Sequence, residues 1–251
     1  MSQNKIVTIV VTGILLIFTS CTPSAILQSN WQAETSPNKP ASQHIPAAFF
    51  SKDNDLTIKL TNNNTQLYVT IETNNPITVK KIVSLGMGLW IDPQGKSQRI
   101  MGINYPLPLD NPQFNLNTFT LQTAARRQQL YKQWFDTLEM VNMTPGETLT
   151  APAKNVDDEI STMVWSTPQV LFHCQYRVPL KKIYPNEEKI QPLHIISIGI
   201  NSVNTAYERD PSSLSSREVL SQKIKSLSAG ATPTDDLTEQ WISFRLAHPL
   251  P

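Results

Sequence analysis

Strict alternation of apolar and polar residues in two neighbouring segments limits the fold of this chain more than any other feature. The segment 56–60 reads LTIKL, the segment 67–71 reads LYVTI, and asparagines 62–64 lie between them. A period of two places the apolar side chains on one face of an extended strand. Asparagine tolerates the positive φ angles of tight turns. These residues therefore predict a β-hairpin with one buried face.

Similar short segments recur along the chain, and nineteen prolines keep them short, because proline interrupts helices and central strands. The residues Asp92-Pro93-Gln94-Gly95 suit a type I turn, with proline second and glycine fourth, so Asp92 is interpreted as a turn residue. The proline-rich segment 105–109 should cross an edge or an end of a sheet. Beyond the hairpin we expect strands at 78–84, 86–91, 97–103, 159–165, 170–178, 193–200 and 239–247.

One segment has helical rather than strand periodicity. Leu130, Trp134, Leu138 and Val141 follow one another at helical spacing. This spacing predicts a helical insertion over residues 123–142.

The segment 207–234 is rich in serine and fits either a loop or a short helix capped by Ser215 and Glu218. Eight or more short strands with one or two helical segments favour a mainly β fold. We expect an antiparallel β-sandwich, immunoglobulin-like or jelly-roll-like, with one helical insertion and a Ser-rich loop or short helix.

The N-terminus contains an apolar run, residues 6–18, after the single basic residue Lys5. At about 1.5 Å per residue, a helix of this length reaches roughly 20 Å. The hydrocarbon core of a bilayer is about 30 Å thick. The run therefore has the length of a signal-peptide apolar region rather than of a membrane span.

The residues that follow are Phe18-Thr19-Ser20-Cys21. They resemble the bacterial lipobox, although Phe18 stands where leucine is usual. The resemblance implies recognition of Phe18, Thr19 and Ser20 by a signal peptidase and removal of residues 1–20. It also implies a diacylglyceryl group, with acyl chains such as palmitate, on the thiol of Cys21. The alternative is a plain signal peptide that has a cysteine near its cleavage site.

The mature chain divides into a tether and one domain. Residues 21–50 are rich in Ser, Pro, Gln, Asn and Ala, which predicts a flexible tether. Residues 51–251 have the length of a single β-sandwich domain. Thr22 stands where an aspartate keeps some bacterial lipoproteins at the inner membrane. We therefore expect a lipid-anchored protein of the cell envelope, with the outer membrane favoured.

Charge and motifs argue against several classes of function. The formal net charge is +1 and no basic face is visible, so nucleic acid is not an expected partner. The sequence contains no G-x-S-x-G, P-loop, H-E-x-x-H or dinucleotide motif. We therefore assign no cofactor, no metal and no catalytic residue.

Four segments follow one another along the chain: TQLYVTIETNN, GMGLWIDPQGK, VLFHCQYRVPLKKI and ISIGIN. Their order over residues 55–201, with Tyr176–Pro179 closing the third segment, resembles the family 9 carbohydrate-binding modules and the related DOMON domains. The resemblance implies a β-sandwich that binds sugars on paired aromatic rings or, in some DOMON members, haem through Met and His. Neither ligand set can be assigned to residues of this chain, and the helical insertion at 123–142 departs from the compact modules.

The tryptophans are the candidates for a sugar-stacking face: Trp90, Trp134, Trp165 and Trp241. Their apolar neighbours favour core packing for each of them, because aromatic side chains bury large areas. Carbohydrate binding requires instead that aromatic rings gather at the surface.

Polar candidates are fewer. His173 and Cys174 are neighbours in an expected strand, so their side chains point to opposite faces and cannot share one metal ion. Cys174 should then be a buried thiol. The acidic run Asp157-Asp158-Glu159 could bind calcium or form a solvated loop. The other histidines form no cluster in the sequence: His44, His194 and His248.

Together these features predict a membrane-anchored envelope lipoprotein with a non-catalytic binding or structural sandwich, whose partner is a glycan or an envelope protein. Two alternatives stay open. An enzyme acting on envelope polymers or glycans would need converging carboxylates or an activated nucleophile. A protein-binding subunit of an envelope assembly would need a broad apolar patch.

Overall fold

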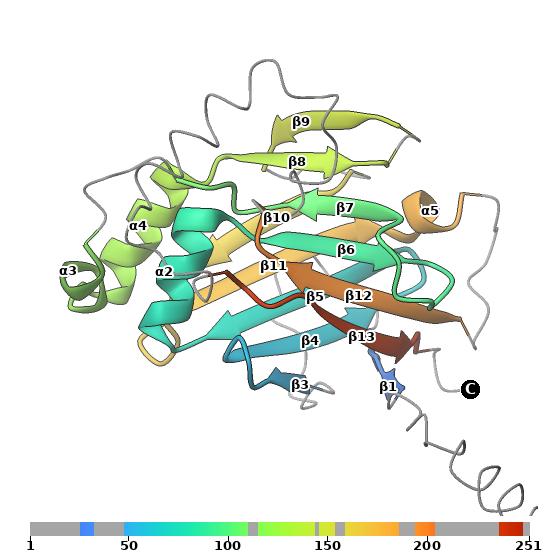
Figure 1. Ribbon diagram of the computed structural model, residues 1–251, viewed down its shortest axis with the longest axis horizontal. Helices are drawn as coiled ribbons and strands as arrows, with labels where there is room; N and C mark the ends of the chain where they lie inside the picture. Colours follow the sequence, from blue (N-terminus) through green and yellow to red (C-terminus); the bar gives the residue numbers. More distant parts are fainter. Residues whose placement is uncertain are drawn as a thin grey trace, which may run out of the picture.

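Two β-sheets lie face to face in the computed structural model of this chain (Figure 1). The structure describes residues 26–32, 48–109, 115–143, 146–153, 159–185, 194–203 and 236–247. Within this part, neighbouring strands are antiparallel except for two parallel pairs, β1 with β13 and β2 with β4. The predicted mainly β, two-sheet sandwich is confirmed.

The larger sheet has seven strands, with β1 at one edge and β9 at the other. In spatial order its strands are β1 (Leu27–Gln28), β13 (Gln240–Arg245), β12 (Ile195–Asn201), β6 (Gly88–Asp92), β7 (Met101–Asn104), β8 (Thr137–Val141) and β9 (Thr148–Pro152).

The smaller sheet has six strands, and β4 pairs with two short strands along its outer side. In spatial order the strands are β10 (Ser161–Trp165), β11 (Phe172–Pro179), β5 (Gln66–Thr73), β4 (Leu56–Asn62) and β2 (Asn30–Trp31), with β3 (Ala48–Ser51) also on β4. The predicted hairpin is β4–β5, and its turn at Asn63 is held by the Asn63 side chain, which accepts from the backbone N–H of Gln66 at 2.7 Å.

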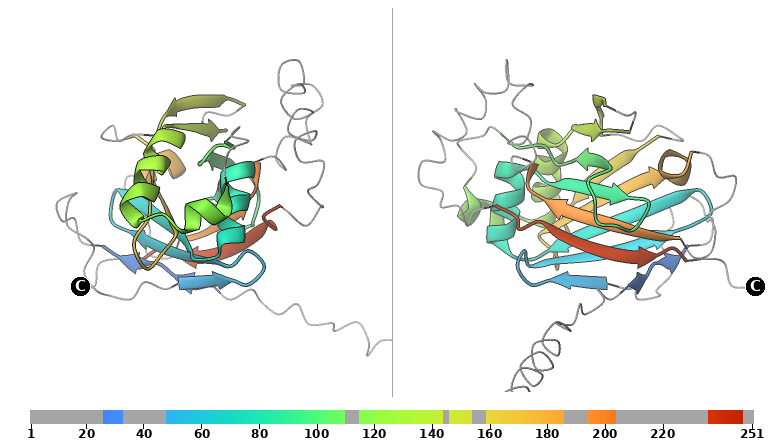
Figure 2. Two further views of the ribbon diagram at one scale, coloured as in Figure 1. Left: turned by 90° about the vertical axis from the view of Figure 1, so that its left-hand side faces the viewer. Right: turned by 45° about the vertical axis from the view of Figure 1, so that its right-hand side comes forward.

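In the part of the chain that the structure describes, four short helices lie around the sandwich (Figures 1 and 2). They are α2 (Pro76–Leu85), α3 (Leu116–Thr120), α4 (Ala124–Trp134) and α5 (Leu180–Ile183). No helix in the described ranges is long and apolar enough to cross a membrane.

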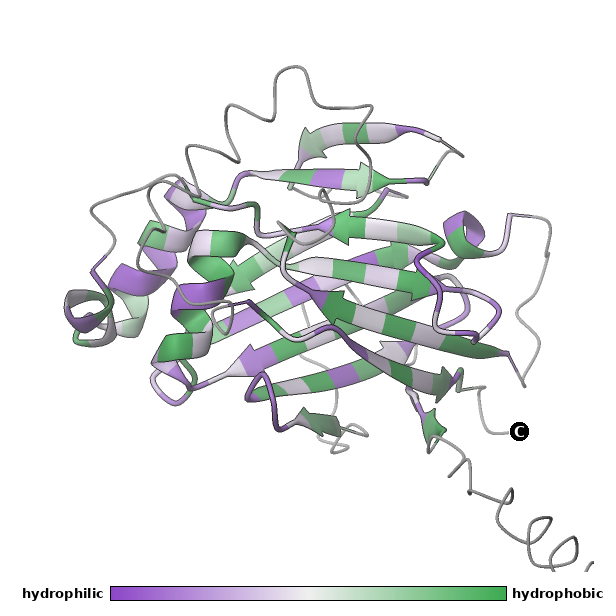
Figure 3. Ribbon diagram, viewed as in Figure 1, coloured by the Kyte–Doolittle hydropathy of each residue, from purple (hydrophilic) through white to green (hydrophobic). Residues whose placement is uncertain are grey.

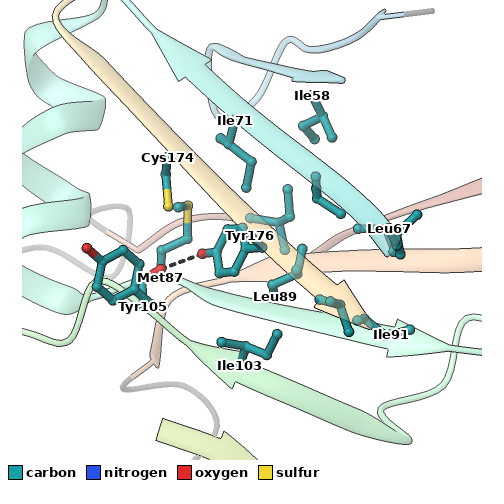
Figure 4. Packing of buried hydrophobic residues seen from close by; sticks show 14 of the residues in the cluster. Ile58, Leu67, Ile71, Met87, Leu89, Ile91, Ile103, Tyr105, Cys174 and Tyr176 are labelled. Atoms are coloured by element: carbon teal, nitrogen blue, oxygen red, sulfur yellow. Dashed lines mark hydrogen bonds between the residues drawn. The ribbon is translucent and has the colours of Figure 1, made fainter. Parts of the chain in front are cut away.

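The core fills the space between the sheets. Colouring by hydropathy shows the alternation along the strands (Figure 3). Figure 4 shows the packed layer, to which both sheets contribute: Ile58, Leu67, Ile71, Cys174 and Tyr176 from one, and Leu89, Ile91 and Ile103 from the other. The Tyr176 hydroxyl donates to the Tyr105 carbonyl within this layer. Burial raises the pKa of the Cys174 thiol far above its ordinary value.

The predicted strand at 78–84 is wrong, because this segment belongs to the helix α2. The Asn75 side chain caps the helix by accepting from the backbone N–H groups of Ile77 and Thr78, and Pro76 occupies the first turn. The helix buries Val79, Ile82 and Val83, which have helical spacing. In so short a segment, apolar residues alone do not distinguish a helix from a strand.

The predicted helical insertion at 123–142 is only half correct. Its first part is α4, capped by Thr123. Residues 137–141 instead form β8, which pairs with β7 and β9. The helix ends at Trp134, because its C-cap Phe135 has a φ of −122°, which is not helical. Leu138 fits the helical stripe by spacing, but it is buried as an inward residue of a strand.

The predicted boundary between tether and domain at residue 51 is too late. The strands β1, β2 and β3 all precede or reach residue 51 and belong to the two sheets. Composition assigned these segments to a flexible tether, but their backbone hydrogen bonds to β13 and β4 make them part of the folded domain. The lipobox residues 18–21, His44, residues 157–158, residues 207–234 and His248 lie outside the described residues.

Candidate functional site

A row of tryptophans and glycines crosses the outer face of the seven-stranded sheet. The strand register aligns Trp241 on β13, Gly199 on β12, Trp90 on β6 and Gly102 on β7. Leu89 and its alternate neighbours on β6 point into the core, so Trp90 points outward. We call Trp90, Arg99, Asn201, Glu239 and Trp241 the outer strip.

Glycines let the two indole rings lie close to the sheet. A Cβ atom at Gly102 would come within 2.9 Å of ring atoms of Trp90. A Cβ atom at Gly199 would come within 2.9 Å of ring atoms of Trp241. Both rings therefore rest against backbone that has no side chain, a use of glycine in strands that permits close approach.

A charged pair lies beside the rings. Arg99 donates to Glu239 through two bonds, Nε to Oε1 at 3.1 Å and Nη2 to Oε2 at 2.7 Å. The Arg99 guanidinium also lies 5.3 Å from the Trp90 ring centre, within range of a cation–π contact. The indole N–H of Trp241 donates to Glu239 Oε1 at 3.0 Å. One carboxylate thus joins a guanidinium to an indole.

Buried amides continue the strip on the next row of the sheet. The indole N–H of Trp90 donates to Asn201 Oδ1 at 3.0 Å. Asn104 Nδ2 donates to Glu139 Oε2 at 3.2 Å. Gly88 lies between the two amides, and a Cβ atom there would come 2.7 Å from Asn201 Oδ1. The amides are therefore held in place before any ligand arrives.

The rings differ in how much surface they offer. Trp90 is only 6% exposed, and Arg99 covers its outward side. Trp241 is partly exposed. A ligand reaching this face would meet the Trp241 ring and the Arg99–Glu239 pair first. The strip therefore offers one accessible indole, and the surface gathering of aromatic rings expected for carbohydrate binding is reduced here to Trp241 beside the Arg99–Glu239 pair.

The prediction of core packing for all four tryptophans is wrong for Trp165 and Trp241, which are partly exposed, whereas Trp90 is buried as predicted but on the outer face of its sheet. Trp90 and Trp241 belong to the outer strip, and Trp165 stacks on His173 outside the six-stranded sheet, with ring centres 4.8 Å apart and planes 1° apart. Alternation along a strand, not residue type, sets the direction of each side chain. Trp134 packs against the core beside Tyr131, as predicted.

The prediction that His173 and Cys174 point to opposite faces is confirmed. Cys174 lies in the core, whereas His173 Nδ1 lies 3.4 Å from Glu72 Oε1 on the outer face. Glu72 also pairs with Lys59 Nζ at 2.6 Å. These partners, His173 first, hold the pKa of the Glu72 carboxyl below its ordinary value despite partial burial. Glu72 thus links Lys59 and His173 on the outer face of the six-stranded sheet, as a structural contact.

The other sequence candidates have structural roles where the structure describes them. Asp92 is a turn residue, as predicted: its carboxylate accepts from the backbone N–H groups of Gln94, Lys96 and Gln98 at 2.8, 2.8 and 3.0 Å. The strand expected at 97–103 is shorter, because this loop takes up its first residues and the strand β7 begins at Met101. His194 packs on Tyr184. No group of three metal-ligating side chains occurs among the described residues.

The sequence contains a signal for the outer strip that neither strand periodicity nor known motifs reveal. The tripeptide Gly-Ile-Asn occurs at 102–104 and again at 199–201. The two copies lie on β7 and β12, which flank β6 on either side. In each copy the glycine lies beside Trp90, the isoleucine enters the core and the asparagine lies beside Gly88. A glycine in the middle of a strand often indicates that another group approaches the backbone closely at that position.

Comparison with known proteins gives few matches. No protein-family model matches the chain, and no curated protein matches its sequence. Two solved structures of a family 9 carbohydrate-binding module from Caldicellulosiruptor kristjanssonii are similar to it. The one in complex with glucose has 9% identity and a TM-score of 0.33, and the match covers 90% of this chain and 97% of that chain. The one in complex with cellotriose has 11% identity and a TM-score of 0.25, over 59% and 56% of the two chains.

Proposed function

We propose that this chain is a lipid-anchored envelope protein whose sandwich binds glycans at the outer strip. The observation that carries the proposal is the Trp241 ring, which rests on Gly199 beside the Arg99–Glu239 pair. A sugar ring has an apolar C–H face and a rim of hydroxyl groups. The indole suits the C–H face, and the carboxylate and guanidinium suit the hydroxyls as charged hydrogen-bond partners.

The strip is also built on rigid elements. Its rings, amides and charged groups lie on or next to the hydrogen-bonded strands β13, β12, β6 and β7 of the seven-stranded sheet. Side chains positioned by strands hold their geometry better than side chains on loops. Binding to such a site loses little conformational entropy.

The geometry of the strip favours binding over hydrolysis. Glu239 is the carboxylate of the outer strip, and Glu139 binds the adjacent amide of Asn104; they lie at the start of β13 and on β8, four strands apart. At about 4.8 Å per strand, their backbones are roughly 19 Å apart. Glycosidases use carboxylate pairs about 5–9.5 Å apart. These two carboxylates therefore do not form such a pair.

The anchor belongs to the same proposal. The apolar run at 6–18 and the lipobox-like residues 18–21 support acylation of Cys21, and Thr22 favours the outer membrane. Several acyl chains bind a bilayer stably, because each buried CH₂ contributes about 0.8 kcal/mol. Metabolic labelling with a tagged fatty acid tests this step. Cys21→Ser should abolish the label, and a label that persists in this variant would contradict acylation at Cys21.

Glycan binding is tested by calorimetric titration of residues 24–251 against β-glucan, xylan and N-acetylated oligosaccharides. We expect saturable binding to one of these classes, and Trp241→Ala should weaken it about tenfold or more, which is about 1.4 kcal/mol. Trp165→Ala is the matched control, because Trp165 lies outside the other sheet. Loss of binding in the Trp165 variant with retention in the Trp241 variant would contradict the assigned face.

A further inference from the structure

The first described segment of the chain joins the two sheets at one edge of the sandwich. Leu27 pairs with Phe244 on β13, and Trp31 pairs with Asn62 on β4. Between them, Ser29 Oγ donates to Asn62 Oδ1 at 2.5 Å and accepts from the backbone N–H of Ala247 at 2.7 Å. Residues 27–31 are therefore part of the folded body.

This placement leaves a short connection to the proposed acylation site. Leu27 follows Cys21 by six residues. Even a fully extended chain covers at most about 3.6 Å per residue, so six residues reach roughly 20 Å. A lipid on Cys21 therefore keeps β1 within this distance of the membrane surface.

We propose that the edge formed by β1, β2 and β3 rests on the bilayer surface. In this orientation the planes of both sheets are perpendicular to the membrane, and β9 lies at the edge farthest from it. This inference rests on the acylation of Cys21 in the proposed function. The partner is the headgroup region of the membrane to which the chain is anchored.

The chemistry of this edge suits a membrane interface. Ile26 beside β1 is 48% exposed, and Phe50 on β3 is 55% exposed. Lys52 and Arg245 are exposed near the ends of β3 and β13. Apolar side chains can enter the interfacial layer, and cations favour anionic headgroups. Figures 1 and 2 show β1 and β3 on the same side of the molecule in all three views.

The sheet order gives the direction of the opposite edge. Six strand spacings separate β1 from β9. At about 4.8 Å each, β9 lies roughly 29 Å from β1 across the sheet. The outer strip lies on the sheet face between them, so it opens sideways and stays accessible to a glycan.

The inference is tested with the full-length acylated protein in vesicles that carry a headgroup quencher. Gln28→Cys on β1 and Thr150→Cys on β9 each add one exposed thiol for a fluorophore. Cys174 is fully buried and its thiol pKa is raised, so it should not react. We expect strong quenching at position 28 and none at position 150. Equal quenching at both positions, or quenching at position 150 alone, overturns the orientation.

Two controls separate the proposed orientation from the proposed acylation of Cys21. Flotation of the vesicles measures whether the protein is membrane-bound. Protein that does not float overturns both the acylation of Cys21 and the inference. Protein that floats without quenching at position 28 overturns the inference and leaves the anchor standing. A variant with a twenty-residue (roughly 25 Å) Gly-Ser insert after Ser24 should float but lose the quenching. Quenching that persists in this variant would contradict the role of the short connection.

Discussion

Glycine residues determine the shape of the outer strip as much as the tryptophans do. Gly102 and Gly199 have no positive φ angle that would require glycine, so their role is the space that a missing Cβ atom leaves. Each space is filled by an indole ring. The two sites differ because Trp90 is buried and Trp241 is partly exposed.

This difference predicts unequal costs for two identical substitutions. Gly102→Ala should lower the free energy of unfolding by about 1–3 kcal/mol, because Trp90 has no room to move away from the new methyl group. Gly199→Ala should cost less, because the Trp241 ring can tilt toward solvent, but it should weaken glycan binding. Urea denaturation of both variants tests this, and equal costs would contradict the assigned burial of the rings.

Glu72 should make stability depend on acid pH. Its pKa in the folded protein lies below the ordinary value of 4.5, mainly through His173 and then Lys59. The ionised Glu72 carboxylate therefore stabilises the fold fully above about pH 5, and this stability is lost as the pH falls through the folded-state pKa of Glu72. Glu72→Gln should flatten the dependence of unfolding free energy on pH below pH 5. An unchanged profile would show that other carboxyls dominate.

Among the elements, α4 is held in place by one buried guanidinium. Arg127 is 5% exposed, and its Nε donates to Ser166 Oγ at 2.8 Å while Nη2 donates to the Thr167 carbonyl at 3.0 Å. It also donates to the Gln122 carbonyl at the start of the helix. These bonds tie the helix to the turn between β10 and β11.

Loss of this tie should be costly. Arg127→Ala leaves buried acceptors without their donor, and we expect a loss of roughly 2–4 kcal/mol in unfolding free energy. Arg126→Ala is the matched control: the neighbouring residue is exposed, and within the described residues its side chain bonds to Gln129 of the same helix, so its change should stay within about 0.5 kcal/mol. Similar losses in thermal or urea unfolding of the two variants would contradict the anchoring role of Arg127.

Elements with a long or clean pattern could be predicted from sequence, and mixed segments could not. The hairpin β4–β5 follows directly from its period of two. The segment 78–84 was predicted as a strand and is helical, and the segment 137–141 was predicted as helical and is a strand. Both errors have one cause: short apolar segments fit the helical period and the strand period equally well, and only packing decides between them. The outer strip was not predicted, because strand neighbours point to opposite faces and residue type alone assigns the tryptophans to the core. The two Gly-Ile-Asn copies could have located it.

At the scale of the whole molecule, the N-terminal strands close the sandwich. They extend the edges of both sheets, and the Asn62 amide beneath them is buried and donates to the Ala247 carbonyl at 3.0 Å. Ser29, next to β1 and β2, is thus hydrogen-bonded to Asn62 on β4 and to Ala247, which follows β13.

Removal of this closure should destabilise the entire domain. A fragment of residues 33–251 should lose at least about 3 kcal/mol relative to residues 24–251, because it loses ladder bonds and leaves Asn62 short of partners. It should also associate, since two sheet edges become open. Thermal unfolding and size-exclusion chromatography measure both effects. Equal melting temperatures would contradict the closure.

Glycan recognition at the outer strip is the central claim, and the indole N–H signals test it most directly. The chain has five tryptophans, so ¹⁵N-labelled residues 24–251 should give five such signals, each assignable by one substitution. On titration with a binding oligosaccharide, we expect the Trp241 signal to shift saturably while those of Trp134 and Trp165 stay fixed. If the oligosaccharide binds and the Trp241 signal does not move, the outer strip is not the site.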